Sequence, residues 1–125
     1  MSDQITKAEF EVMDVLWSQN PLAASDVADR LSEQKSWSLK TVKTLLSRLV
    51  DKGAVEHELD GRRFLYHPVV TREHYAQSVT GRLADQLFGG RAAPLVAHLA
   101  EGRGLSPEDI TELEALIREL KRERD

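Results

Sequence analysis

The sequence predicts a mostly α-helical fold with one small β-hairpin, divided between an N-terminal domain over residues 1–72 and a helical C-terminal domain over residues 73–125. Three observations predict this fold. Apolar residues recur with a helical period over most of the chain, and the period changes to two between residues 55 and 68. The third observation is charge: residues 38–72 contain seven Lys or Arg and four Asp or Glu, in a chain whose net charge is −4.

The first two predicted helices are short and lie before residue 37. Thr6 and Glu9 have the spacing of a capping box, and a broad apolar face follows them, so a helix is expected over residues 7–18. The segment NPLAAS ends that helix. Ser25 is a suitable N-cap for a second helix, which carries Val27 and Leu31.

The third predicted helix begins after Ser38, which can cap it, and ends near Gly53. At 100° per residue, its apolar face contains Leu39, Val42, Leu45, Leu46, Leu49 and Val50. Its opposite face contains Lys40, Thr41, Thr44, Ser47 and Arg48, with Lys43 at the boundary. No acidic residue occurs between residues 38 and 50, although 30% of the chain is charged. This face is therefore suited to a polyanion.

A β-hairpin is predicted over residues 55–68, because the dipeptide Asp60-Gly61 separates two short β-prone runs and Pro68 ends the second. A two-residue turn at this dipeptide would pair Glu58 with Arg63 and His57 with Phe64. Val55, His57, Phe64 and Tyr66 would then share the inner face of the hairpin.

Three further helices are predicted in the C-terminal domain. Pro94 is expected to begin the middle one, and Ser106 to cap the last, with Pro107 at its first position. Their apolar residues exceed what three short helices can cover among themselves, which predicts packing against a second copy of the chain. The residues expected at this dimer interface are Tyr75, Val79, Leu83, Leu87, Leu95, Leu99, Ile110, Leu113, Ile117 and Leu120.

Three helices followed by a hairpin is the element order of a winged helix-turn-helix, whose third helix enters the major groove of double-stranded DNA. The arginines at the hairpin tip would then contact the adjacent backbone or minor groove. The residues expected to contact DNA are Ser25, Ser38, Lys40, Thr41, Lys43, Thr44, Ser47, Arg48, Arg62 and Arg63. An alternative is a winged helix that binds an acidic protein partner without sequence-specific DNA binding.

Other functions find little support in the sequence. No phosphate-binding glycine loop or activated nucleophile is present, so we do not expect an enzyme. The absence of cysteine and the positions of the four histidines give no metal-ligand spacing, and no cofactor is expected. No leader and no apolar run of about 20 residues occurs, which predicts a cytoplasmic protein without membrane insertion.

Several stretches closely resemble the penicillinase repressor family (BlaI/MecI, with CopY as a copper-responsive branch). They are, in order, EFEVMDVLW, LAASDVADRL, WSLKTVKTLLSRLVDKGAV, GRRFLYHPVV, LFGG, PLVAHLAE and LSPEDITELEALI, so the resemblance covers about residues 5–120. It implies a homodimeric transcriptional repressor bound to a palindromic operator, with an N-terminal winged helix and a C-terminal dimerisation domain.

The resemblance also implies how repression ends. Family members that work with a membrane sensor metalloprotease are cut within the helix that matches PLVAHLAE, at a position corresponding to His98 and Leu99. Those members carry Asn-Phe at this position, whereas this sequence does not. The copper-responsive branch binds metal through C-terminal cysteines, which are absent here. The resemblance therefore implies release by proteolytic cleavage, with a membrane sensor metalloprotease as partner, or by another signal acting on the C-terminal domain, rather than by copper binding.

Overall fold

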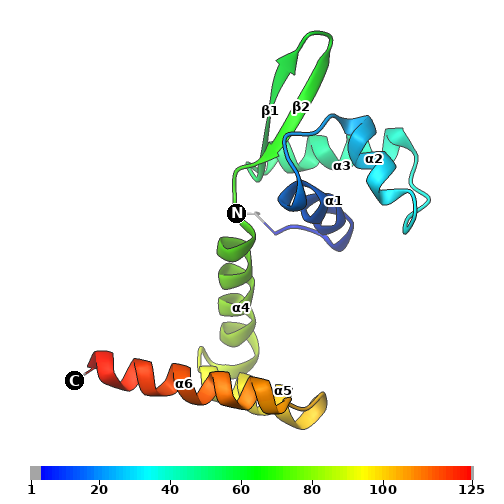
Figure 1. The fold of residues 1–125 in the computed structure, drawn as a ribbon. Coiled ribbons are helices and arrows are strands. Elements are labelled where there is room, and N and C mark those ends of the chain that lie inside the picture. Colours follow the sequence, from blue (N-terminus) through cyan, green and yellow to red (C-terminus); the bar gives the residue numbers. More distant parts are fainter. Residues whose placement is uncertain (1–3, 125) are drawn as a thin grey trace. The chain divides into compact units, whose positions relative to one another are not determined.

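The computed structural model describes residues 4–124, which form six α-helices and one two-stranded sheet (Figure 1). The elements are α1 (Lys7–Ser18), α2 (Ala24–Leu31), α3 (Leu39–Asp51), β1 (Val55–Asp60), β2 (Arg63–Pro68), α4 (Arg72–Phe88), α5 (Ala92–Gly102) and α6 (Pro107–Arg124). The predicted mostly α-helical fold with one hairpin is confirmed. The chain divides into two units, the first ending at Ala76 and the second beginning at Gln77, so the division falls inside α4 rather than after residue 72.

The start of α1 is formed by the predicted capping box. The Thr6 hydroxyl accepts a hydrogen bond from the Glu9 backbone N–H at 3.1 Å, and the Glu9 carboxylate accepts one from the Thr6 N–H at 2.9 Å. Two of the donors that a helix start leaves unpaired are therefore satisfied locally. The predicted bounds of α1 are confirmed.

The predicted start of α2 is wrong. Ala23, not Ser25, is the N-cap, and Ser25 lies in the first turn. The reason is a contact with the hairpin: Leu22 and Tyr66 exchange two backbone hydrogen bonds of 3.0 and 2.8 Å, which hold Leu22 in an extended conformation. The helix begins directly after this bridge, and the Asp26 carboxylate accepts the Ala23 N–H at 3.3 Å.

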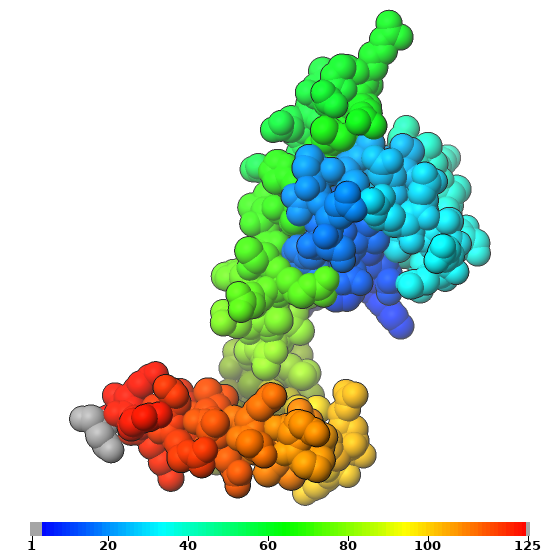
Figure 2. Space-filling view, in the orientation of Figure 1, coloured from blue at the N-terminus to red at the C-terminus, as the bar shows by residue number. Residues whose placement is uncertain are grey.

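The hydrophobic core of the first unit lies between α1, α2, α3 and the base of the hairpin. Its fully covered side chains are Val12, Met13, Leu16, Val27, Val42, Leu46 and Leu49. Val55, the first residue of β1, is also buried, whereas the rest of that strand is exposed. The hairpin is therefore held on the helices by Val55 and by the partly buried half of β2, which includes Tyr66. Figure 2 shows its tip, in green, projecting from the helical part of this unit.

The hairpin is present over the predicted residues, but its turn is shifted by one residue. Asp60 pairs with Arg63, and the two turn residues are Gly61 and Arg62. Gly61 has a φ of +67°, whereas no non-glycine residue among those described has positive φ. Glycine thus takes the first turn position, as a type II′ turn requires, and not the second position of a type I′ turn.

This shift changes the predicted cross-strand pairs. His57 pairs with Tyr66 and Glu58 with Leu65, so the predicted pairs of His57 with Phe64 and of Glu58 with Arg63 are wrong. Each partner moves by two residues along the strand, which preserves the face on which a side chain lies. The His57 ring accordingly still contacts the Phe64 ring, with 4.5 Å between centroids.

The helices of the second unit carry no buried residue in the isolated chain. The Ser106 hydroxyl caps α6 by accepting the Asp109 N–H at 3.0 Å, and Pro107 is its first residue, both as predicted. Pro94 does not begin α5, because the helix already starts at Ala92 and Pro94 is its third residue. Proline is tolerated there because the first turn needs no intrahelical N–H donor.

The first turn of α4 packs on α1 within the first unit. Tyr75 lies against Phe10 and Trp17, with ring centroids 5.9 and 5.7 Å away, and the Trp17 indole N–H donates to the Val70 carbonyl at 2.9 Å. Arg72 pairs with Asp14 and lies over the Trp17 ring. Tyr75 is therefore half-buried within the first unit, whereas the other residues expected at the dimer interface belong to the second unit.

Candidate nucleic-acid interface

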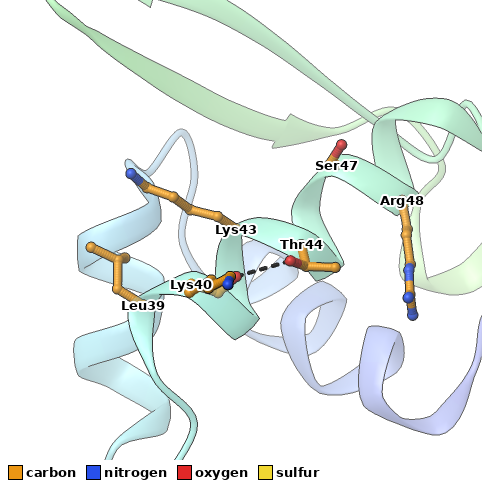
Figure 3. A pocket seen from close by; sticks show the side chains of 6 residues that line it. All are labelled: Leu39, Lys40, Lys43, Thr44, Ser47 and Arg48. Atoms are coloured by element: carbon orange, nitrogen blue, oxygen red, sulfur yellow. Dashed lines mark hydrogen bonds between the residues drawn. The ribbon is translucent and has the colours of Figure 1, made fainter.

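The surface of α3 that faces away from the core is cationic and rich in hydroxyl groups. Val42, Leu45, Leu46 and Leu49 hold the helix on the core. The side chains that line a shallow groove on the opposite side are Leu39, Lys40, Lys43, Thr44, Ser47 and Arg48 (Figure 3). We call these six residues the α3 face. It contains three cations and no acid, because the first acidic residue of the helix is Asp51.

Hydrogen bonds fix the start of α3 and turn some hydroxyls toward the backbone. Ser38 caps the helix as predicted, accepting the Thr41 N–H at 3.1 Å and donating its own hydroxyl to Thr41 Oγ1 at 3.1 Å. Thr44 Oγ1 donates to the Lys40 carbonyl at 3.0 Å, which Figure 3 shows as a dashed line. The hydroxyl donor of Thr44 is therefore engaged within the helix.

The cations of the α3 face have no acidic partner among the residues that the structure describes. Within residues 4–124, the salt bridges do not include Lys40, Lys43 or Arg48. Unpaired, exposed cations can neutralise the phosphates of a nucleic acid and release its counterions. Thr44 and Ser47 lie between Lys43 and Arg48 along the helix, and their short side chains permit a close approach to base edges.

A second groove connects the α3 face to the hairpin. It is lined by Ala23, Ala24, Ser25, Leu39, Lys43, Arg62, Arg63, Phe64 and Tyr66. The turn residue Arg62 has no salt bridge among the described residues, whereas Arg63 lies 3.8 Å from the Asp60 carboxylate. The structure thus brings together Ser25, Lys43 and both hairpin arginines, which come from three different elements. Burial raises the pKa of the Tyr66 phenol at the floor of this groove.

One prediction for this region was wrong. Leu39, expected on the apolar face, is 42% exposed and lines both grooves. At about 100° per residue it lies about 60° from Val42, at the edge of the apolar face rather than in its middle. The sequence also gave no reason to place Phe64 in this region, although it lies beside the turn and 45% of it is exposed.

Comparisons with known proteins identify the family. The penicillinase repressor family model matches residues 5–119, which is nearly the whole chain. The chain belongs to the penicillinase repressor family. The penicillinase repressor of Bacillus licheniformis is 35% identical over 118 residues, covering 94% of this chain and 92% of that protein. The methicillin resistance regulatory protein MecI of Staphylococcus aureus (strain N315) is 29% identical, covering 91% and 93%.

Solved structures of penicillinase repressor family members support the fold of the first unit. The solution structure of the DNA binding domain of the repressor BlaI matches with a TM-score of 0.54 and 40% identity, covering 60% of this chain and 92% of that one. The Bacillus licheniformis BlaI monomeric form in complex with the blaP half-operator matches with a TM-score of 0.50 and 42% identity, covering 58% and 88%. The first unit is therefore a winged helix, in which α3 is the third helix and β1 and β2 form the wing.

Membership of the penicillinase repressor family also decides whether the protein is an enzyme. The family consists of repressors, which confirms that this protein is not an enzyme. None of the helices described in residues 4–124 combines the length and the apolar character needed to cross a bilayer.

Proposed function

We propose that this protein is a homodimeric transcriptional repressor that acts in the cytoplasm by binding a palindromic operator through α3 and the wing. The observation that carries the proposal is the α3 face, whose three cations are exposed and unpaired while the wing arginines line the adjoining groove. An α-helix fits the major groove, and a winged helix places its third helix there. The assignment agrees with the similar Bacillus licheniformis BlaI monomeric form, which is solved in complex with the blaP half-operator.

The ten residues expected to contact DNA have distinct proposed roles. We propose that Lys40, Lys43 and Arg48, which line the groove on α3, contact phosphates or guanine acceptors. Arg62 and Arg63, which line the second groove, would contact the neighbouring backbone or minor groove. The hydroxyl residues complete the surface at the starts of α2 and α3 and along α3; they are Ser25, Ser38, Thr41, Thr44 and Ser47.

Dimerisation is proposed through the second unit. Leu83, Leu87, Leu99, Ile110, Ile117 and Leu120 are each at least 40% exposed in the single chain, and Val79, Leu95 and Leu113 are half-buried. Exposed apolar side chains on every helix of such a short segment indicate an interface, since burial is worth about 25 cal/mol per Å². A two-fold axis would also present two α3 helices to the two halves of a palindrome.

Release of repression is proposed to occur through the second unit, by cleavage between His98 and Leu99 in α5 by a membrane sensor metalloprotease or by another signal that acts on this unit. Both residues lie in the interior of this helix, and the Leu99 carbonyl accepts the backbone N–H groups of Arg103 and Gly104 at 3.1 Å. The side chain of Leu99 is 45% exposed, so it is accessible on the isolated chain. Cleavage would separate α6 from the first unit and weaken the dimer.

The proposed DNA binding is tested by selecting sites from a random DNA pool with the full-length protein. We expect enrichment of a palindrome, and electrophoretic mobility shifts in which the enriched site binds at least about 1,000-fold more tightly than scrambled DNA. The matched control is a triple variant, Lys40→Gln, Lys43→Gln and Arg48→Gln, which should keep the fold and lose enrichment. A wild-type protein that enriches no sequence would contradict the proposal and favour a winged helix that binds an acidic protein.

A further inference from the structure

Leu39 is the one large apolar side chain that residues 4–54 leave exposed. Every other Leu, Ile, Val, Met, Phe or Trp in this stretch is buried or partly covered. A single exposed leucine is ordinary on a protein surface. The position of Leu39 is unusual, because this side chain lies on the α3 face beside Lys40 and Lys43 and borders both grooves. The one exposed large apolar side chain of residues 4–54 thus lies where the DNA is proposed to bind.

Leu39 is the first residue of α3, directly after the N-cap Ser38. When the third helix of such a fold enters the major groove, its N-terminal residues approach the base edges. Figure 3 shows Leu39 one turn before Lys43, with both side chains on the same side of the helix. A contact made by Leu39 would therefore adjoin one made by Lys43.

The major groove offers one apolar group to such a side chain. The edges of the bases present hydrogen-bond donors and acceptors, except for the C5-methyl group of thymine. The leucine side chain has no polar atom, so its transfer out of water is favourable only when it packs against an apolar surface. Opposite cytosine or a purine, Leu39 would cover polar atoms without pairing them, which carries a free-energy cost.

We infer that Leu39 is a specificity-determining residue that contacts the 5-methyl group of a thymine in each half of the operator. The inference rests on the proposed function, since it requires α3 to lie in the major groove. It predicts that the preferred site has a conserved thymine in each half, at the step facing the start of α3. The lysines supply affinity there, whereas Leu39 selects the base.

The experiment replaces thymine by deoxyuridine, which lacks only the 5-methyl group. Full-length protein is titrated against the site enriched from the random pool, with each thymine of the half-sites replaced in turn. For the wild type, we expect one position per half-site at which deoxyuridine weakens binding about fourfold. This factor corresponds to the loss of one buried methyl group from the interface. Leu39→Ala should bind the thymine site more weakly and show no difference between thymine and deoxyuridine at that position.

Two further variants serve as controls. Leu39→Met keeps an apolar side chain of similar size and should retain the sensitivity to deoxyuridine. Val69→Ala removes apolar atoms from a residue that is 50% exposed and lines neither groove, and it should behave as the wild type. Circular dichroism of each variant should match the wild type, because neither position belongs to the buried core.

The outcomes separate this inference from the proposed function. Selective operator binding by the wild type, with equal affinity for thymine and deoxyuridine at every half-site position, would overturn the role of Leu39 and leave the function standing. A deoxyuridine effect that persists in Leu39→Ala would also overturn it, and would assign the methyl contact to another residue such as Thr44. Failure of the wild type to prefer any site would reject the proposed function itself.

Discussion

Lys52 and Glu9 form a salt bridge that connects the C-terminal end of α3 to the first turn of α1. The Lys52 ammonium lies 2.5 Å from Glu9 Oε1 and also donates to the Gln4 carbonyl at 2.8 Å. Glu9 is completely buried, whereas the Lys52 side chain is 24% exposed. The second oxygen of Glu9, Oε2, has no hydrogen-bond partner among the described residues. Removing Lys52 would therefore leave a buried carboxylate without a counter-charge, whereas removing Glu9 would leave an ammonium group that still reaches water.

Replacing Lys52 should destabilise the protein more than replacing Glu9. Lys52→Met leaves a buried carboxylate without its counter-charge, and we expect the free energy of unfolding to fall by about 3–5 kcal/mol. Glu9→Gln keeps an oxygen acceptor for the Thr6 N–H and leaves an ammonium that reaches water, so a loss of about 1–3 kcal/mol is expected. Urea denaturation of both variants measures the difference. In the Glu9→Gln background, Lys52→Met should cost much less; equal costs in both backgrounds would contradict the coupling.

The same pair predicts a dependence of stability on pH. Burial by itself raises the pKa of Glu9, but the hydrogen bonds from Lys52 and Thr6 and the Lys52 charge outweigh it, so the pKa lies below the ordinary value of 4.5. A group with a lowered pKa in the folded state stabilises the protein above its unfolded pKa, and this contribution is lost as the pH falls through the folded value. The stability difference between the wild type and Glu9→Gln should therefore be constant from about pH 7 to 5 and shrink below about pH 4.5. Urea denaturation across this range tests it; a difference that grows at low pH would have the wrong sign.

Arg48→Ala should impair operator recognition without impairing folding. The side chain is exposed on the α3 face and has no salt bridge within the described part of the chain, so its loss breaks no ion pair there. We expect a loss of about 1–3 kcal/mol in binding to the operator and a smaller loss on scrambled DNA. Arg103→Ala, which removes the same charge from an exposed position in the second unit, is the matched control. Equal losses on both DNAs would show that Arg48 does not read sequence.

Thr44→Val separates the methyl group of this residue from its hydroxyl. The hydroxyl already donates to the Lys40 carbonyl, so the variant loses this intrahelical bond but keeps its methyl surface. We expect operator affinity within about threefold of the wild type for Thr44→Val and a larger loss for Thr44→Ala. Mobility shifts with one operator compare the two. A larger loss for valine than for alanine would indicate that the hydroxyl contacts DNA.

Arg62→Ala should weaken binding to every DNA sequence alike. Arg62 lies in the wing turn and has no salt bridge among residues 4–124, as expected for a phosphate contact. Each lost phosphate contact should reduce the slope of log K against log salt concentration by about 0.9. Titrations at several salt concentrations, on operator and scrambled DNA, measure this slope. An unchanged slope, or an effect confined to the operator, would assign Arg62 a different role.

Leu120→Asp should dissociate the dimer and thereby weaken operator binding. The side chain is 49% exposed in the single chain, so the substitution does little to the fold of one copy but places a charge in the proposed interface. Sedimentation should show a monomer at micromolar concentration, with much weaker operator binding because the two α3 helices no longer bind together. Thr111→Asp adds the same charge to an exposed position of α6 that is not among the residues expected at the interface. This variant should remain dimeric. A wild type that is itself monomeric and binds its operator tightly would refute the dimer.

Some elements were predictable from the sequence because they depend on neighbouring residues. The bounds of α1 and the start of α3 follow from capping hydrogen bonds that span three residues, from Thr6 to Glu9 and from Ser38 to Thr41. The cationic face of α3 was equally visible, because a helix of fixed period places Lys40, Thr44 and Arg48 on one side whatever surrounds it. The family was also recognisable from the sequence, because each stretch that resembles it is a continuous segment of the chain.

Only the tertiary structure decided the features that join distant parts of the chain. The start of α2 depends on the bridge between Leu22 and Tyr66, which are 44 residues apart, and the burial of Glu9 depends on Lys52, 43 residues further on. The exposure of Leu39 likewise depends on where the core ends, which the helical period leaves open at the edge of the apolar face. Local hydrogen bonds determine the elements, whereas packing between elements decides which side chains at their margins are buried and which are exposed on the α3 face.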